Sequence, residues 1–275
     1  MSDERRQDDG VLFEKQGARA TIWLNRPEVR NALDESMVRQ LRRYIAEASA
    51  DDSVRVIVLR GRGGDFCTGT NLRTFDIERM GETASSFDPR EQTGFYAVRS
   101  GWRMIDNDDI PKPTISVVEG FAVAGGFELM LSTDFAIATE DAQIGDCHLR
   151  RGLIGAAGVL WAVARMAGMR RMKELVLTAR LLSATEAHQW GLVNQVVPAS
   201  QLDAAVDELV ETLVALDPRM LHVAKQLYGR SLEADKETLS VLEQFALMAV
   251  LSHPDTAQSI EQFQSRGSVG FGTAE

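Results

Sequence analysis

The sequence predicts an α/β protein in which strands and helices alternate first and helices dominate later. Three apolar, β-rich runs end near Arg60, Val118 and Ala138, and helical stretches separate them. Repetition of strand, helix and strand is typical of a parallel or spiral core. After about Val159, apolar residues recur mainly at helical spacing. We therefore expect an α/β core that leads into a helical region.

The first elements follow from local signals. Strand-forming runs over 11–16 and 18–24 flank Gly17 and predict a β-hairpin. Asp34 is a typical N-cap residue. The helix that it begins places three apolar side chains on one face: those of Met37, Leu41 and Ile45. The next apolar run, 54–60, predicts a buried strand.

Helices account for most of the second half of the chain. A capping box formed by Ser183 and Glu186 begins one of them. The other predicted helices cover residues 159–168, 171–179, 201–216, 220–228 and 236–251. A short predicted strand over 193–197 interrupts them, and an earlier helix around Trp102 precedes Pro111.

Composition predicts a soluble protein without a targeting segment. The chain has 275 residues, 44% of them hydrophobic, so it can bury a large core. Its start, MSDERRQDDG, is charged and lacks the apolar region of a secretory signal, which predicts a flexible leader. No apolar run approaches the length of a membrane span. We expect a cytoplasmic protein that does not enter membranes.

Charge and cysteine content argue against several other classes. A net charge of −10 disfavours binding to nucleic acid, because phosphate neutralisation requires clustered Lys and Arg. Cys67 and Cys147 have neither disulfide nor metal-ligand spacing and are expected to be inert. The motifs of α/β-hydrolases, P-loop NTPases and zinc proteases do not occur, and no metal site is predicted.

Two glycine-containing loops that follow strands are the most informative features. One includes Gly69 and Thr70, and the other leads through Gly125 into a helix whose first turn holds Glu128. Glycines let the backbone approach a ligand, and free N–H groups at a helix start can bind an oxygen that gains negative charge. Such glycines also occur for packing alone, but two such loops together indicate a pair of N–H donors.

Four segments together resemble the crotonase, or enoyl-CoA hydratase/isomerase, superfamily. They are RPEVRNAL (26–33), FCTGTNLR (66–73), AGGFELMLSTDFAIA (124–138) and LLSATEAHQWGLVNQVV (181–197). The resemblance implies a crotonase-like β/α spiral core over 11–198, after the flexible leader at 1–10. It also implies a helical region over 199–275, with a mobile tail, through which the chain forms homotrimers that often pair into hexamers.

The resemblance also implies a site for an acyl-CoA thioester. The two backbone N–H groups of the family's oxyanion hole correspond to those of Thr70 and Gly125. Glu128 matches the first of two catalytic carboxylates in the hydratases. His148 replaces the second one, and it can either exchange protons near neutral pH or simply line the pocket. A nearby carboxylate, such as Asp146 or Glu128, would favour the charged form of His148. Asp146 matches a position that is not normally catalytic.

The CoA end of the site corresponds to three segments. They are Glu28, Val29 and Arg30, then Asn71, Leu72 and Arg73, and finally Arg266 near the C-terminus. Arg73 stands where the family often has lysine, and Asn71 where it commonly has aspartate. Each arginine can equally be a surface charge. No cofactor is expected, because the CoA thioester is the substrate.

The expected function is that of an acyl-CoA enzyme that stabilises a thioester enolate. Hydration of an enoyl-CoA is the expected reaction, with Glu128 as the principal acid or base. One alternative keeps the oxyanion hole and changes the reaction to isomerisation, decarboxylation or thioester hydrolysis. Another is a catalytically silent acyl-CoA-binding scaffold, which would account for the missing second carboxylate.

Overall fold

The computed structural model describes residues 10–74, 110–155, 158–231 and 234–265. The chain divides into two compact units, residues 1–218 and 219–275, and each is considered by itself. Within the described ranges, no helix combines the length and the apolar character that crossing a bilayer requires.

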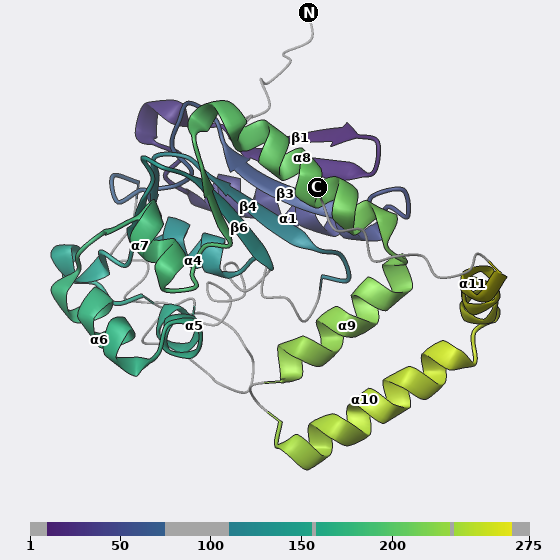
Figure 1. Cartoon of the computed structure of the whole chain (residues 1–275). Helices are drawn as coiled ribbons and strands as arrows, with labels where there is room; N and C mark the ends of the chain where they lie inside the picture. Colours follow the sequence, from purple (N-terminus) through teal and green to yellow (C-terminus); the bar gives the residue numbers. More distant parts are fainter. Residues whose placement is uncertain (1–9, 75–109, 156–157, 232–233, 266–275) are drawn as a thin grey trace, which may run out of the picture. The chain divides into compact units, whose positions relative to one another are not determined.

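A six-stranded sheet forms the centre of the first unit (Figure 1). Its strands run in the order β1-β2-β3-β4-β6-β9. Their bounds are Val11–Gln16, Arg19–Leu24, Val56–Gly61, Thr114–Val118, Phe135–Thr139 and Gln195–Val197. β1 and β2 form an antiparallel hairpin, and all the remaining neighbouring strands of this sheet pair in parallel. Parallel neighbours need long connections, so the strands are widely spaced in the sequence.

Different helices cover the two faces of this sheet. α1 (Glu35–Ala50) packs on β1 and β2 and buries Met37 in the same core as Ile22. Asp34 begins α1 by accepting a hydrogen bond from the Met37 N–H at 2.9 Å. α8 (Leu202–Ala215) packs on β3 and β6 and crosses the opposite face (Figure 1). Alternate strand residues therefore meet different helices.

A smaller sheet of three strands packs against a short buried helix. It contains β5 (Phe121–Val123), β7 (Gln143–Gly145) and β8 (Leu182–Ser183), in that order. Only two residues separate the end of β4 from the start of β5, and α4 (Gly125–Leu131) starts directly after Ala124. All seven residues of α4 are buried. This sheet thus holds the start of α4 inside the core.

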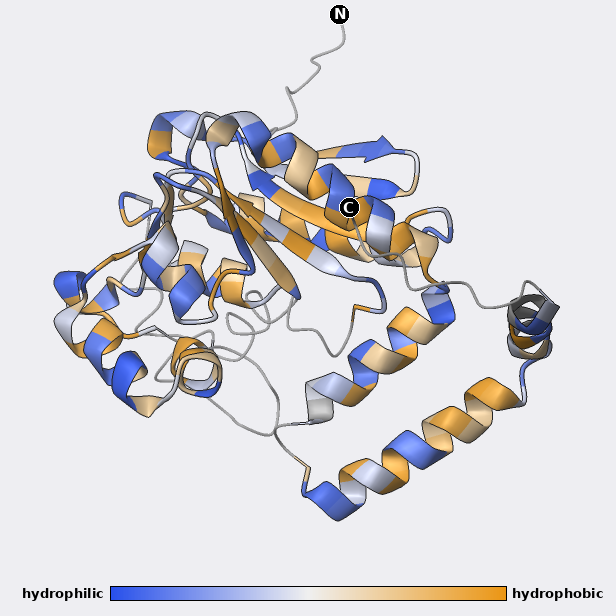
Figure 2. Cartoon of the chain, in the orientation of Figure 1, coloured by the Kyte–Doolittle hydropathy of each residue, from blue (hydrophilic) through white to orange (hydrophobic). Residues whose placement is uncertain are grey.

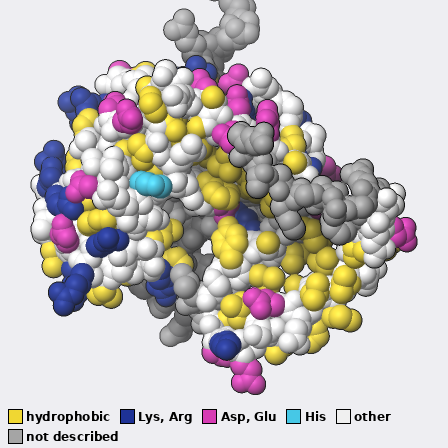
Figure 3. All heavy atoms as spheres, in the orientation of Figure 1, with side chains coloured by type: hydrophobic (Ala, Val, Ile, Leu, Met, Phe, Trp, Pro, Cys, Tyr) yellow, Lys and Arg dark blue, Asp and Glu magenta, His cyan; other side chains and the backbone are white. Residues whose placement is uncertain are grey.

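Among the described residues of the first unit there are also three further helices and three 3-10 turns. The helices are α5 (Val159–Met166), α6 (Met169–Thr178) and α7 (Ala184–Gln189), and the turns are η1 (Pro27–Val29), η3 (His148–Arg151) and η4 (Ala199–Gln201). Ser183 and Glu186 form the capping box that begins α7. Basic side chains gather on the surface around α6 (Figure 3).

The second unit consists of helices. They are α9 (Pro218–Arg230), whose first residue belongs to the first unit, α10 (Lys236–Leu251) and α11 (Pro254–Ser265). The side chain of Asp235 accepts from the Thr238 N–H and begins α10. α10 carries many apolar residues (Figure 2), and Phe245 and Met248 on it are 71% and 66% exposed.

Most elements expected from the sequence are confirmed, including the hairpin, the Asp34 cap, the capping box and α10. The helix expected around Trp102, and residues 1–9 of the expected leader, lie outside the described ranges. Three short strands, β5, β7 and β8, and the helix α11 were not predicted. A three-residue strand is too short to show an alternating pattern. α8, which the expected boundary at residue 198 placed in the helical region, groups with the first unit.

Candidate active site

The loop after β3 and the segment from β4 into β5 lie side by side. Three backbone hydrogen bonds of 2.8–3.1 Å join them: Phe66 N–H to the Glu119 carbonyl, Cys67 N–H to the Phe121 carbonyl, and Val123 N–H to the Cys67 carbonyl. Cys67 and Ala122 also form a parallel bridge. Because the two segments run in the same direction, the residues that follow, Gly69 and Gly125, come together.

Gly69 and Gly126 are required by this close approach. A Cβ atom on Gly69 would lie 2.7 Å from the backbone nitrogen of Gly125, and one on Gly126 would lie 2.1 Å from the carbonyl oxygen of Cys67. Gly69 also has a φ of +86°, which side chains disfavour. The two glycine loops recognised in the sequence are therefore in direct backbone contact.

The N–H groups of Thr70 and Gly125 are left available by the local backbone. The residues on either side of Thr70 bond to Leu33: Leu33 N–H donates to the Gly69 carbonyl at 2.7 Å and Asn71 N–H to the Leu33 carbonyl at 2.8 Å. Alternation along an extended segment then directs the Thr70 N–H away from Leu33. Gly125 is the first residue of α4, where an N–H has no partner within the helix. Neither N–H has an acceptor among the described residues.

Ala124 begins α4 in a conformation that is rare for a residue with a side chain. Its φ and ψ are 52° and −123°. Its N–H donates to the Gly145 carbonyl at 3.1 Å, and its carbonyl accepts from the Glu128 N–H at 3.0 Å, so both ends of the residue are held. A backbone conformation of this kind costs on the order of 1–3 kcal/mol and is found most often at functional sites. No pattern in the sequence indicated this strain.

Glu128 and His148 both lie close to Gly155. Glu128 lies on α4 and is 5% exposed, while the His148 side chain is 14% exposed. A Cβ atom on Gly155 would lie 3.1 Å from Glu128 Oε1 and 3.2 Å from His148 Nδ1. Both side-chain atoms are therefore within 3.2 Å of one point. The structure thus brings together the two residues at the predicted carboxylate positions.

Asp146 pairs with His148. It is 2% exposed, and its Oδ1 forms a hydrogen bond with Nδ1 of the His148 ring. Burial of the ring lowers the pKa of His148, but the hydrogen bond with Asp146 and the negative charges of Glu128 and Asp146 outweigh it. The pKa of His148 is therefore raised above the ordinary value of about 6.5. Asp146 was one of the two carboxylates expected near His148, and the structure places it in direct contact with the ring.

Asn31 ties the segment before α1 to the loop after β3. Its Nδ2 donates to the carbonyls of Arg62 and Asp65 at 2.9 and 2.7 Å, and its Oδ1 accepts from the Arg26 N–H at 2.8 Å. Asn31 is fully buried and has a φ of 55°, which Asn tolerates better than most residues. It fixes the base of the loop that ends in Gly69 and Thr70. The motif RPEVRNAL contains it, but its bonds were not predicted.

The enoyl-CoA hydratase/isomerase family model matches residues 14–273. The chain belongs to the enoyl-CoA hydratase/isomerase family. The short-chain-enoyl-CoA hydratase of Clostridium acetobutylicum is 30% identical over 265 residues, which cover 96% of this chain and 98% of that protein. The 4-chlorobenzoyl coenzyme A dehalogenase-2 of an Arthrobacter species is 29% identical over 262 residues, which cover 94% of this chain and 92% of that protein.

A solved structure supports the same family. The crystal structure of a Thermobifida fusca YX protein in complex with CoA matches with a TM-score of 0.78 and 30% identity, over 88% of this chain and 93% of that one. The predicted superfamily and its mixed α/β fold are thereby confirmed. Members of the enoyl-CoA hydratase/isomerase family thus include enzymes with different reactions, so membership alone leaves the reaction of this chain open.

The residues expected at the CoA end lie in two neighbouring segments. Arg30 directly follows η1, which contains Glu28 and Val29, and its carbonyl accepts from Thr68 Oγ1 at 3.2 Å. The Arg30 side chain lies over the Phe121 ring, 4.9 Å from its centroid, and 3.8 Å from Asp65. Its exposed fraction is 59%, so it remains accessible to an anionic ligand.

The second segment follows Thr70 directly. Asn71 accepts from the Arg73 N–H at 3.2 Å, which turns the chain, and Leu72 is 45% exposed. Arg266 lies outside the described residues. Two of the three expected CoA segments are therefore placed beside the amide pair.

The cysteines and other potential ligands do not suggest a metal or thiol site. Burial raises the pKa of Cys67 to about 12, and burial also raises the pKa of Cys147. A thiol in this state is a poor nucleophile. In the described part of the chain, no cluster of His, Cys, Asp and Glu could hold a metal ion.

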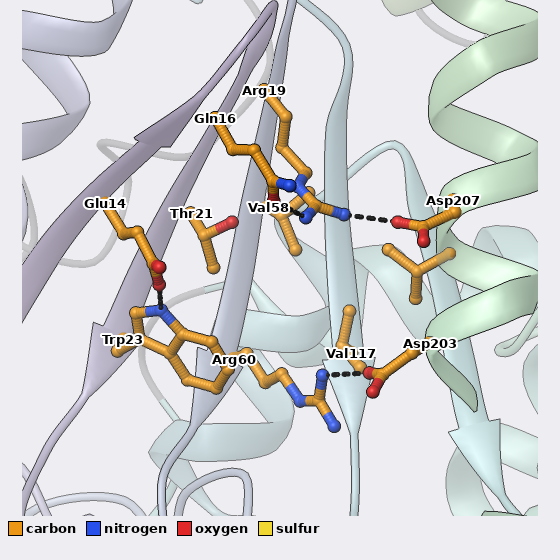
Figure 4. Close-up of a pocket in the computed structure, with 11 residues that line it drawn as sticks. Glu14, Gln16, Arg19, Thr21, Trp23, Val58, Arg60, Val117, Asp203 and Asp207 are labelled. Atoms are coloured by element: carbon orange, nitrogen blue, oxygen red, sulfur yellow. Dashed lines mark hydrogen bonds and ion pairs between the residues drawn. The ribbon is translucent and has the colours of Figure 1, made fainter. Parts of the chain in front are cut away.

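A separate cavity of about 320 Å³ lies between α8 and the sheet (Figure 4). Its charged side chains pair with one another: Arg19 with Asp207, and Arg60 with Asp203. Trp23 at its edge donates from Nε1 to Glu14 at 2.9 Å. None of the described residues of the candidate active site lines this cavity. Its paired charges connect α8 to β2 and β3.

Proposed function

We propose that this chain binds the thioester of an acyl-CoA with its carbonyl oxygen between the N–H groups of Thr70 and Gly125, and that it adds water to an enoyl-CoA. The observation that carries the proposal is the close approach of Gly69 to Gly125. A Cβ atom on Gly69 would lie only 2.7 Å from the backbone nitrogen of Gly125. This contact supports two adjacent donors that have no acceptor among the described residues.

The amide pair would act on the charge that forms during the reaction. When a nucleophile adds to the β-carbon of an enoyl thioester, negative charge moves to the thioester oxygen. Loss of one preorganised donor to such an oxygen costs about 3 kcal/mol in other enzymes. Backbone donors fixed by neighbouring hydrogen bonds need little reorganisation, so they bind the enolate better than the neutral carbonyl.

Glu128 would be the group that activates water. It is buried on α4, three residues after Gly125, so its side chain and the Gly125 N–H belong to the same helix. His148 lies near Glu128 and supplies a second group that can exchange protons. Two such groups are what hydration requires: one removes a proton from water and the other protonates the α-carbon.

The relatives support the choice of substrate. One is a short-chain-enoyl-CoA hydratase, and another was solved in complex with CoA. We propose that the segments containing Arg30 and Arg73 bind the CoA end of the same ligand and that no additional cofactor takes part. The exposed apolar side chains of α10, such as Phe245, support self-association as a trimer or hexamer.

A product screen tests the proposal without assuming the reaction. The purified chain would be incubated with a panel of saturated, unsaturated and carboxylated acyl-CoAs, and the products would be identified by mass spectrometry. Hydration is expected as a gain of one water on enoyl-CoAs, with loss of the absorbance of the conjugated double bond. Binding of acyl-CoA without any change in mass would contradict the enzymatic function and support a scaffold.

Another reaction of the family is the second candidate. The observation that favours it is the Asp146–His148 pair, because His148 takes the position at which the hydratases of the family carry their second carboxylate. In the screen, loss of carbon dioxide, migration of the double bond or release of free CoA would replace hydration. Each outcome keeps the amide pair and changes the roles of the side chains.

A further inference from the structure

The bonds of Asp146 fix the orientation of His148. Asp146 Oδ1 accepts from the backbone N–H of His148 at 3.3 Å and also binds Nδ1 of its ring. One carboxylate oxygen therefore holds both the backbone and the imidazole. Because Nδ1 is engaged, Nε2 is the nitrogen that remains for a ligand, and it has no partner within the described residues.

The charges around the His148 ring are mainly negative. Glu128 on α4 and Asp146 before η3 both act on the ring. The basic groups on η3 itself, Arg150 and Arg151, have exposed side chains. The charged residues of the neighbouring helices α5 and α6 are also exposed: Arg165, Arg170, Arg171, Lys173 and Glu174. Two buried carboxylates beside one ring favour its protonated form.

We propose that Asp146 is a positioning residue that holds His148 as an imidazolium opposite Glu128, so that His148 donates the proton to the α-carbon while Glu128 takes the proton from water. This inference rests on the hydration reaction proposed above. In place of two carboxylates, the site would then hold a negatively charged base, Glu128, and a positively charged acid, His148, before substrate binds.

Addition of water moves two protons and one electron pair among Glu128, His148 and the substrate. Glu128 takes a proton from water as the water oxygen bonds to the β-carbon, and the electron pair of the double bond moves through the α-carbon onto the thioester oxygen. The enolate then returns the pair to the α-carbon, which takes the proton from Nε2 of His148. Transfer of the proton on Glu128 to His148 through solvent restores both groups.

The sign of the pH dependence follows from the raised pKa of His148. The donor is present below this pKa and is lost as the pH rises through it, which gives an alkaline limb in the profile of kcat/KM against pH. Asp146→Asn keeps an oxygen that can accept from Nδ1 but removes the negative charge. The pKa of His148 should then fall, and the alkaline limb should move to lower pH.

The test combines two measurements on the full chain. ¹⁵N NMR of labelled histidines follows the titration of His148, which is assigned with His148→Gln. Kinetics across pH follow the alkaline limb for the native chain, Asp146→Asn and the control Asp141→Asn. Asp141 is exposed on the turn before β7, so the control makes the same chemical change outside the pair.

The expected result is a His148 titration above about 6.5 in the native chain, moved to lower pH by Asp146→Asn and unchanged by Asp141→Asn, with the alkaline limb moving in parallel. His148→Gln should reduce kcat by about 100-fold or more, with a smaller effect on KM. A titration that Asp146→Asn leaves in place would overturn the positioning role. A shifted titration with an unmoved kinetic limb would overturn the donor role of His148.

Failure of the proposed function gives a different result. If no acyl-CoA is turned over, then hydration and the donor role of His148 are both wrong. The NMR titration still decides whether Asp146 holds the ring, since it needs no substrate.

Discussion

The two halves of the candidate active site are held by different forces. The amide pair of Thr70 and Gly125 is positioned by main-chain hydrogen bonds between two loops and by glycines whose replacement would create clashes. The acid–base half depends on side chains, because Glu128 and His148 are oriented by burial and by the carboxylate of Asp146. Apart from its glycines, the backbone half therefore tolerates changes of side chain, whereas the side-chain half can acquire a new chemistry through one substitution.

Glu128→Gln tests the side-chain half with the largest expected effect. The substitution keeps the shape of the side chain and removes its ability to take a proton, so kcat should fall by roughly 10² to 10⁴. Steady-state kinetics on the substrate found in the screen measure this loss. Glu140→Gln, at an exposed position, is the control and should leave kcat unchanged. Turnover that survives Glu128→Gln would assign the base to another residue.

Gly69→Ala tests the backbone half. Its new Cβ would lie 2.7 Å from the Gly125 nitrogen, so the two loops must separate and kcat should fall by about 10² to 10³. Gly64→Ala is a matched control, because Gly64 has nearly the same φ, +85° against +86°, but nothing lies within 4 Å of the added atom. Equal activity of the two variants would show that the loop contact has no catalytic role.

Asn31→Ala tests the support beneath the backbone half. The change removes three hydrogen bonds of a buried side chain, two to backbone carbonyls and one from a backbone N–H. The free energy of unfolding should fall by about 1–3 kcal/mol or more, as measured by urea denaturation. Asn31→Gly separates the causes, since Gly accepts the φ of 55° without strain. Unchanged denaturation midpoints would mean that the loop is held elsewhere.

Thiol labelling tests whether the two loops stay closed in solution. Cys67 belongs to the first loop and bridges Ala122 of the second segment, and its Sγ is 3.2 Å from the Asn31 carbonyl and 3.4 Å from the Gly69 nitrogen. With its pKa raised to about 12 by burial, Cys67 should react with a thiol reagent only after unfolding, while the half-buried Cys147 reacts slowly. Cys147→Ser isolates the signal of Cys67. Rapid native-state labelling of that variant would indicate loops that open.

The contrast between the two halves also explains what the sequence could predict. Glycines and their spacing from Glu128 are local signals, so the two loops and the helix start were predictable. The strained Ala124 and the bonds of Asn31 depend on residues far apart in the chain and left no local pattern. Asp146 was predictable as a carboxylate near His148, but the direct bond between them was not, because neighbouring residues on a loop do not reveal their side-chain directions. The strands β5 and β7 were too short to show a period.

The central claim is that two backbone amides bind one thioester oxygen. A crystal structure of the Glu128→Gln variant with crotonyl-CoA measures this directly, because the substrate should remain intact. We expect the thioester oxygen about 2.7–3.1 Å from the nitrogens of both Thr70 and Gly125, while the native chain turns over the same substrate in solution. A bound thioester whose oxygen faces solvent, or contacts neither nitrogen, would contradict the account.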